Sequence, residues 1–157
     1  PKLLGMTVED ALAYPLLLQG LTPVQTRSRL QEWTQRLQIP SDWMSLSEWQ
    51  LSVAQRQLVS LTRALAMEPK LLLLDEPTDA FDPPLTAYVI DVFRQVSQQR
   101  NLPILSVDRD LDPVRAFASR ILYLQDGELL EDAIVDCIDW EQLGETLRRA
   151  ESQLEFL

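Results

Sequence analysis

One stretch decides the fold of this chain: Leu71-Leu72-Leu73-Leu74-Asp75-Glu76-Pro77-Thr78-Asp79-Ala80-Phe81-Asp82. Four consecutive aliphatic residues predict a short strand that is buried on both faces, as in a parallel sheet. This strand would deliver two adjacent carboxylates, Asp75 and Glu76, at its carboxyl end, the edge where open α/β sheets hold their ligands. A carboxylate there can hold Mg²⁺ on a nucleotide, and a second one beside it can polarise an attacking water.

Helical patterns precede this strand. We expect helices over residues 7–20, with an interruption near Pro15, and over residues 22–37 and 52–67. The second helix begins with Thr22, Pro23 and Gln25, which form a capping box around a proline at the first helical position. Three tryptophans follow within a short span and are predicted to pack the joint between helices: Trp33, Trp43 and Trp49.

Strands and helices alternate after the carboxylates. A helix with an apolar stripe from Leu85 to Val96 leads to a second buried strand over 103–107, then to a hairpin over 121–130 and a last helix after Asp139. A strand–helix–strand order requires parallel pairing. The chain is therefore predicted to be α/β, with a mostly helical lobe over residues 1–67, an α/β lobe over 68–130 and a helical tail over 131–157.

Composition limits the classes of function. The 157 residues, of which 46% are hydrophobic, suit one globular domain or a large piece of one. A net charge of −10 argues against a nucleic-acid partner, because binding to phosphate backbones depends on Lys and Arg. The single cysteine, Cys137, excludes an internal disulfide, and the absence of histidine excludes an imidazole base. No apolar run approaches the roughly 20 residues that cross a bilayer, so a link to a membrane requires a partner.

Four motifs, in order and spacing, resemble those of the ATP-binding subunits of ABC transporters. The run Leu51-Ser52-Val53-Ala54-Gln55 resembles the signature Leu-Ser-Gly-Gly-Gln, and the run ending in Asp75-Glu76 resembles the Walker B strand. The run Asp79-Ala80-Phe81-Asp82 falls on the D-loop, and Val107-Asp108-Arg109-Asp110-Leu111 falls on the switch-histidine loop. The resemblance implies a partial P-loop NTPase-like parallel sheet with an α-helical ABC subdomain.

The resemblance also implies roles for individual residues. Asp75 takes the position of the metal ligand, Glu76 that of the general base and Arg109 that of the residue that touches the γ-phosphate. The remaining nucleotide contacts fall on Ser52, Val53, Ala54, Gln55 and Asp82. The implied cofactors are ATP and Mg²⁺, and the implied partners are a second ABC ATPase subunit and an integral membrane permease. The location implied is cytoplasmic, at the inner or plasma membrane through that permease.

Several residues depart from the family pattern, and all of them would touch the nucleotide. Val53 and Ala54 replace two glycines whose lack of a Cβ lets backbone N–H groups approach phosphate. Arg109 replaces the histidine; it can donate to phosphate but cannot relay a proton. It could equally be a solvated loop residue or pair with its neighbours Asp108 and Asp110. Asp79 stands where the family usually has Ser.

The 157 residues contain no G-x-x-x-x-G-K-[ST] phosphate loop. We expect this loop to lie before Pro1 in a longer parent, and we expect the isolated chain not to hydrolyse ATP, because that loop supplies most of the phosphate binding. Three readings remain open: an ATPase subunit of an ABC transporter, a degenerate domain that dimerises and regulates without turnover, and an ABC-type DNA-maintenance ATPase. The third is disfavoured because the chain has neither long coiled coils nor a basic face.

Overall fold

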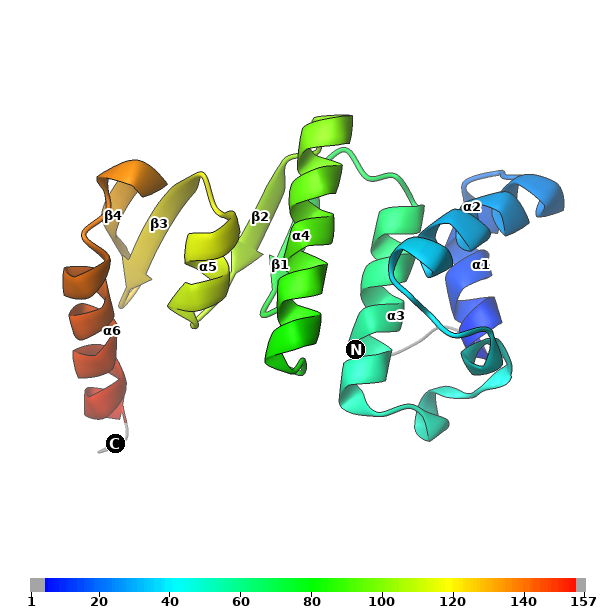
Figure 1. The fold of residues 1–157 in the computed structure, drawn as a ribbon, viewed down its shortest axis with the longest axis horizontal. Coiled ribbons are helices and arrows are strands. Elements are labelled where there is room, and N and C mark those ends of the chain that lie inside the picture. The colour runs from blue at the N-terminus through cyan, green and yellow to red at the C-terminus, as the bar shows by residue number, and fades with distance from the viewer. Residues whose placement is uncertain (1–4, 155–157) are drawn as a thin grey trace. The chain divides into compact units, whose positions relative to one another are not determined.

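The computed structural model describes residues 5–154 (Figure 1). The chain divides into two compact units, Pro1–Arg109 and Asp110–Leu157. The boundaries expected near residues 67 and 130 stay predictions. Unit 1 contains the following elements: α1 (Val8–Leu18), α2 (Pro23–Arg36), the 3₁₀ helices η1 (Ser41–Ser45) and η2 (Glu48–Gln50), α3 (Val53–Ala66), β1 (Leu72–Asp75), α4 (Pro83–Arg100) and β2 (Ile104–Val107). Among residues 5–154, no helix is both long and apolar enough to cross a bilayer.

Side-chain caps fix where the first three helices begin. Thr7, Thr22 and Ser52 each form a reciprocal capping box with the residue three positions on, which satisfies backbone N–H groups that have no partner within the helix. The expected interruption at Pro15 is wrong, since α1 runs through it. Four side chains of α1 are fully buried, namely Val8, Ala11, Leu12 and Leu16. Their packing holds the helix together although Pro15 removes one internal hydrogen bond.

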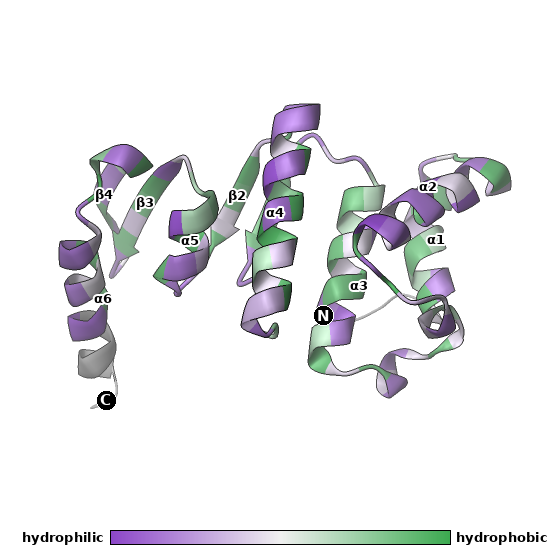
Figure 2. Ribbon diagram, in the orientation of Figure 1, coloured by the Kyte–Doolittle hydropathy of each residue, from purple (hydrophilic) through white to green (hydrophobic). Residues whose placement is uncertain are grey.

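Strands β1 and β2 pair in parallel, with Leu73 opposite Leu105 and Asp75 opposite Val107, which confirms the predicted α/β class and the parallel register. The predicted burial of β1 on both faces is wrong. Leu72 and Leu74 are 4% and 8% exposed, whereas Leu73 is 65% exposed. The described residues of unit 1 therefore cover only one face of this sheet. The other face, called the open sheet face below, consists of four aliphatic side chains that are each at least half exposed: Leu71, Leu73, Leu105 and Val107. Strand β2 is predominantly hydrophobic in Figure 2.

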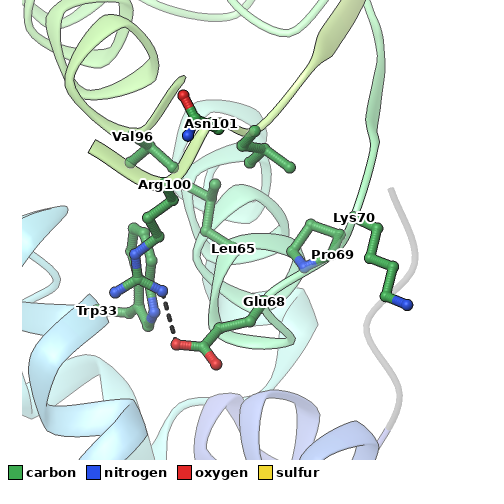
Figure 3. Close-up of a pocket in the computed structure, with 9 residues that line it drawn as sticks. Trp33, Leu65, Glu68, Pro69, Lys70, Val96, Arg100 and Asn101 are labelled. Carbon is green, nitrogen blue, oxygen red and sulfur yellow. Dashed lines mark hydrogen bonds and ion pairs between the residues drawn. The ribbon is translucent and has the colours of Figure 1, made fainter. Parts of the chain in front are cut away.

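Trp33 of α2 is fully buried, as expected of a residue that packs between helices. The guanidinium groups of Arg36 and Arg100 lie 5.4 and 5.0 Å from the centre of its ring. Arg100, from the last turn of α4, also pairs with Glu68 at 2.6 Å (Figure 3). It pairs with Glu32 of α2 at the same distance. This cluster ties α2 to α4.

Trp49 does not follow the packing prediction. Its side chain is 89% exposed on the single turn of η2, and the prediction for it is wrong. Trp43, on η1, is partly buried. A three-residue 3₁₀ turn has no continuous buried face, so proximity in sequence to Trp33 does not bring Trp49 into the core.

Unit 2 consists of α5 (Leu111–Phe117), β3 (Arg120–Gln125), β4 (Glu128–Ile134), η3 (Val135–Cys137) and α6 (Trp140–Leu154). Strands β3 and β4 form the predicted antiparallel hairpin around Asp126 and Gly127. The hydrophobic core of unit 2 contains Ile121, Ile138 and Leu143. Asp139 caps the predicted last helix by accepting the Gln142 N–H at 3.1 Å.

Candidate functional site

Glu76 follows β1 in a left-handed backbone conformation, with φ at 44°. Only a few per cent of non-glycine residues adopt this conformation, and it persists where neighbouring groups enforce it. The Glu76 N–H donates to the Val107 carbonyl at 2.8 Å, which ties the turn to the end of β2. The Glu76 carbonyl accepts from the Asp79 N–H at 3.4 Å and from the Gln57 side chain at 3.5 Å. The main chain of the candidate base is therefore held from three sides.

Arg109 holds the carboxylate of Glu76. Its Nη2 donates to Oε2 at 2.9 Å, and its Nε donates to the other carboxylate oxygen, so the pair is bidentate. The Arg109 side chain is 74% exposed and lies over a Glu76 side chain that is 27% exposed. The hydrogen bond from Arg109 lowers the pKa of the Glu76 carboxyl, with burial acting in the opposite direction. Glu76 consequently stays ionised at neutral pH, and the pair is lost only as the pH falls through this lowered pKa.

Each acidic neighbour of Arg109 also makes a hydrogen bond to another residue. Asp108 accepts a hydrogen bond from the Ser106 hydroxyl, and Asp110 caps α5 by accepting the Asp112 N–H at 3.0 Å. Arg109 pairs with Glu76 while most of its side chain stays exposed, and its contact with a γ-phosphate stays a prediction.

Asp75 ends β1 with an exposed side chain. Within the described part of the chain its carboxylate makes no hydrogen bond or ion pair, so it is available as a hard oxygen ligand. Residues 5–154 hold no group of three His, Cys, Asp or Glu side chains that could bind a metal by themselves. One carboxylate fits Mg²⁺, which commonly takes one or two carboxylates and completes its shell with water and phosphate oxygens.

The predicted signature residues begin α3. Ser52 caps the helix by accepting the Gln55 N–H at 3.2 Å, and Gln55 Oε1 accepts the Ser52 N–H at 2.8 Å. The capping box thus occupies the Gln55 carbonyl oxygen and leaves its NH₂ group as the donor. Val53 is 57% exposed and Ala54 is partly buried, so the valine side chain covers the end of the helix where glycines would expose the backbone.

Asp82 has a structural task in this chain. Its Oδ1 accepts the Leu85 N–H at 2.9 Å and caps α4, where Pro83 occupies the first turn. The sequence pattern of Asp followed by two prolines signals this helix start as well as it signals a D-loop. The structure therefore explains Asp82 without a nucleotide, and its nucleotide contact stays a prediction.

Gln57 is the residue that sequence reasoning missed. Its side chain, half-buried on α3, reaches the carbonyls of Glu76 and Pro77. The sequence offered one signal, since Gln57 follows Val53 by four positions and so lies on the same side of the helix.

A pocket of about 470 Å³ lies elsewhere in unit 1 (Figure 3). Trp33, Leu65, Glu68 and Arg100 are among its lining residues, and none of the candidate nucleotide residues contributes to it.

The parallel strands with Asp75, Glu76 and Arg109 at their carboxyl edge define an α/β protein of the nucleotide-binding class. The family described as ABC transporter matches residues 3–79. The chain belongs to the ATP-binding family of ABC transporters, as its motifs predicted.

Curated relatives support this assignment. The chain is 32% identical to the methionine import ATP-binding protein MetN of Caulobacter vibrioides, over 92% of this chain and 43% of the relative. It is 33% identical to the arginine transport ATP-binding protein ArtP of Escherichia coli K12, over 82% of this chain and 52% of that protein. The chain thus spans about half the length of these relatives.

A solved structure shares the fold. The ATP-binding cassette MJ0796, in a dimeric post-hydrolysis state bound to ADP and Pi, superposes with a TM-score of 0.79 at 25% identity. The match covers 85% of this chain and 59% of that cassette. The α/β prediction, with a partial P-loop NTPase-like sheet, is confirmed by this likeness.

Proposed function

We propose that the chain forms the signature, Walker B and switch-loop part of an ATPase subunit of an ABC transporter. The observation that carries the proposal is the arrangement at the carboxyl edge of β1 and β2. There Asp75 ends the strand with a carboxylate that has no partner among residues 5–154, and Glu76 follows it with its carboxylate held by Arg109. The names of the relatives and the ADP and Pi bound to MJ0796 support a nucleotide as the ligand of this edge.

In this proposal each residue has one task. Asp75 holds the Mg²⁺ that accompanies ATP and neutralises phosphate charge. Glu76 orients the attacking water and accepts its proton, and Arg109 donates hydrogen bonds to a phosphate oxygen once it leaves Glu76. The hydroxyl of Ser52 and the NH₂ group of Gln55 donate to the nucleotide of a second subunit. Val53 and Ala54 keep the backbone of α3 farther from phosphate than glycines would.

Two partners complete the proposed machine. A second ATPase subunit places its nucleotide against the exposed start of α3, as the dimeric state of MJ0796 suggests. An integral membrane permease binds the ATPase subunits, and its transport is coupled to their ATP hydrolysis. Binding to that permease would place the protein at the cytoplasmic side of a membrane. In this proposal the phosphate loop belongs to polypeptide other than these 157 residues, and the open sheet face offers an apolar surface for that polypeptide to cover.

The first test compares ATP turnover by the full-length protein that contains this sequence with turnover by its Glu76→Gln variant. We expect the variant to lose turnover while it keeps its affinity for ATP, measured by calorimetry, because Gln cannot accept the proton. The matched control is Glu128→Gln, at an exposed position of β4, and it should leave turnover unchanged. Nucleotide binding without any turnover by the unmodified protein would favour the regulatory reading instead.

Two further measurements address the departures from the family pattern. The isolated 157-residue chain should not hydrolyse ATP. Micromolar affinity for ATP in this chain would contradict the proposal that most of the phosphate binding is supplied by a loop outside it. In the full-length protein, the triple variant Val53→Gly, Ala54→Gly and Arg109→His should raise turnover. Equal or lower turnover in that variant would show that these positions do not limit the reaction.

A further inference from the structure

We propose that Gln57 is a positioning residue that links the start of α3 to the candidate base Glu76. The inference rests on the proposed ATPase function and deepens it, because it concerns how contact at the signature end of α3 reaches the carboxylate. The contact in the structure points to this residue for that task.

The geometry is a forked hydrogen bond. Nε2 of Gln57 lies 3.3 Å from the Pro77 carbonyl oxygen and 3.5 Å from that of Glu76, the two residues that turn the chain away from β1. The Glu76 N–H donates to β2, its carboxylate pairs with Arg109, and its carbonyl also accepts the Asp79 N–H at 3.4 Å. Gln57 is therefore the contact that α3 makes with this turn through a side-chain amide.

Gln57 lies near the exposed start of α3, so its hydrogen bond connects that end of the helix to the turn after β1. Val53, at the exposed start of the helix, lies one turn away from Gln57 on the same side. From Leu58 onward the helix is anchored by buried side chains, namely Leu58, Val59, Leu61, Thr62, Leu65 and Ala66. A contact made at the first turn would therefore displace the short segment that carries the Gln57 amide.

The length of the forked bond favours a positioning role over a purely structural one. At 3.3 and 3.5 Å it exceeds the usual N–H···O distance of about 2.9–3.0 Å, so a shift of a few tenths of an ångström makes or breaks it. A bond of this kind adds little to folding. It is sensitive to small movements of α3, and it acts on a residue that already has a left-handed backbone.

The test uses Gln57→Met, which has a similar length and no donor, and Gln57→Lys, which restores an N–H donor. Gln98→Met, at an exposed position of α4, is the matched control. In ¹⁵N-resolved NMR spectra of the 157-residue chain we expect Gln57→Met to shift the Glu76 amide and the Nε–H of Arg109. Gln57→Lys should return both signals toward their original positions, and Gln98→Met should leave them unchanged. The melting temperatures of all variants should agree within about 2 °C, because an exposed or half-buried side-chain hydrogen bond contributes little.

In the full-length protein, Gln57→Met should lower kcat by about tenfold while KM for ATP changes less than about twofold, because small misplacements of a base act on chemistry. Unchanged NMR signals in Gln57→Met would overturn the inference, as would an equal response to Gln98→Met. If the unmodified protein has no ATP turnover, the ATPase proposal fails, and the NMR comparison still decides whether Gln57 positions Glu76. If turnover is normal in Gln57→Met, the ATPase proposal stands and the positioning role fails.

Discussion

Substitutions on the two faces of β1 test whether the 157-residue chain buries one face of the sheet or both. Leu72 and Leu73 are neighbours in one strand, but their side chains are 4% and 65% exposed. The same substitution, Leu→Ala, should therefore have different effects at the two positions. Leu72→Ala removes buried methyl groups and leaves a cavity, at a cost of about 3 kcal/mol. Leu73→Ala removes groups that are only about one third buried, and one third of the roughly 1.5–3 kcal/mol for burying a leucine is about 0.5–1 kcal/mol.

Urea denaturation of the 157-residue chain measures this difference. Far-UV circular dichroism and tryptophan fluorescence report unfolding, and Trp33 reports on unit 1 because it is buried there. With a slope of roughly 2 kcal/mol per molar urea, a difference of about 2 kcal/mol separates the two midpoints by about 1 M. Leu105→Ala, on the same face as Leu73, should behave like Leu73→Ala, since Leu105 is 52% exposed.

The same pair of variants in the full-length protein tests what covers the open sheet face. If additional polypeptide packs on it, Leu73→Ala becomes as costly as Leu72→Ala. A similar loss for both variants already in the 157-residue chain would refute the one-sided sheet. A small loss for Leu73→Ala that persists in the full-length protein would show that the face stays exposed.

Three further outcomes are expected. Pro15→Ala should stabilise the chain by about 1–3 kcal/mol in the same urea assay, because it restores an internal hydrogen bond of α1 and removes a ring from the helix interior. Arg100→Ala should destabilise it by about 1–2 kcal/mol, because it removes two ion pairs and the contact with the Trp33 ring; Arg100→Lys should recover only part of this loss, since Lys lacks the planar fork. Asp132→Asn should lower stability at neutral pH, where the ion pair with Arg120 depresses the Asp132 pKa, and should have no effect once the pH has fallen through that lowered pKa, as acid titration of the melting temperature would show.

The sequence predicted the elements of the fold well because local rules determine them. The capping box predicted at Thr22 marks a helix start through contacts three residues apart, and the structure reproduces it; the same contacts occur at Thr7 and Ser52. The errors have a common cause, since each depends on what packs on a residue from elsewhere. Burial of α1 outweighs the local effect of Pro15, and the open face of β1 depends on the presence of a second layer.

For the candidate site, too, the sequence predicts where residues lie but not which distant residues they contact. Asp75 and Glu76 could be placed from the sequence because the end of a parallel strand has a defined position, and Arg109 could be placed beside them because it follows the next strand. The pairing of Arg109 with Glu76 could not, since Asp108 and Asp110 are nearer in sequence and only the fold shows that Ser106 and α5 engage them.

Gln57 is the clearest case of a contact that only the fold reveals. A pattern that reads one element at a time assigns it to the polar side of α3, whereas the fold brings it to two carbonyls about twenty residues away in the sequence. The same helix begins at the signature residues, so its first turn faces a proposed partner and its second turn touches the proposed base. The signature residues and the proposed base are then connected through a single turn of α3, and this connection does not require a domain to move.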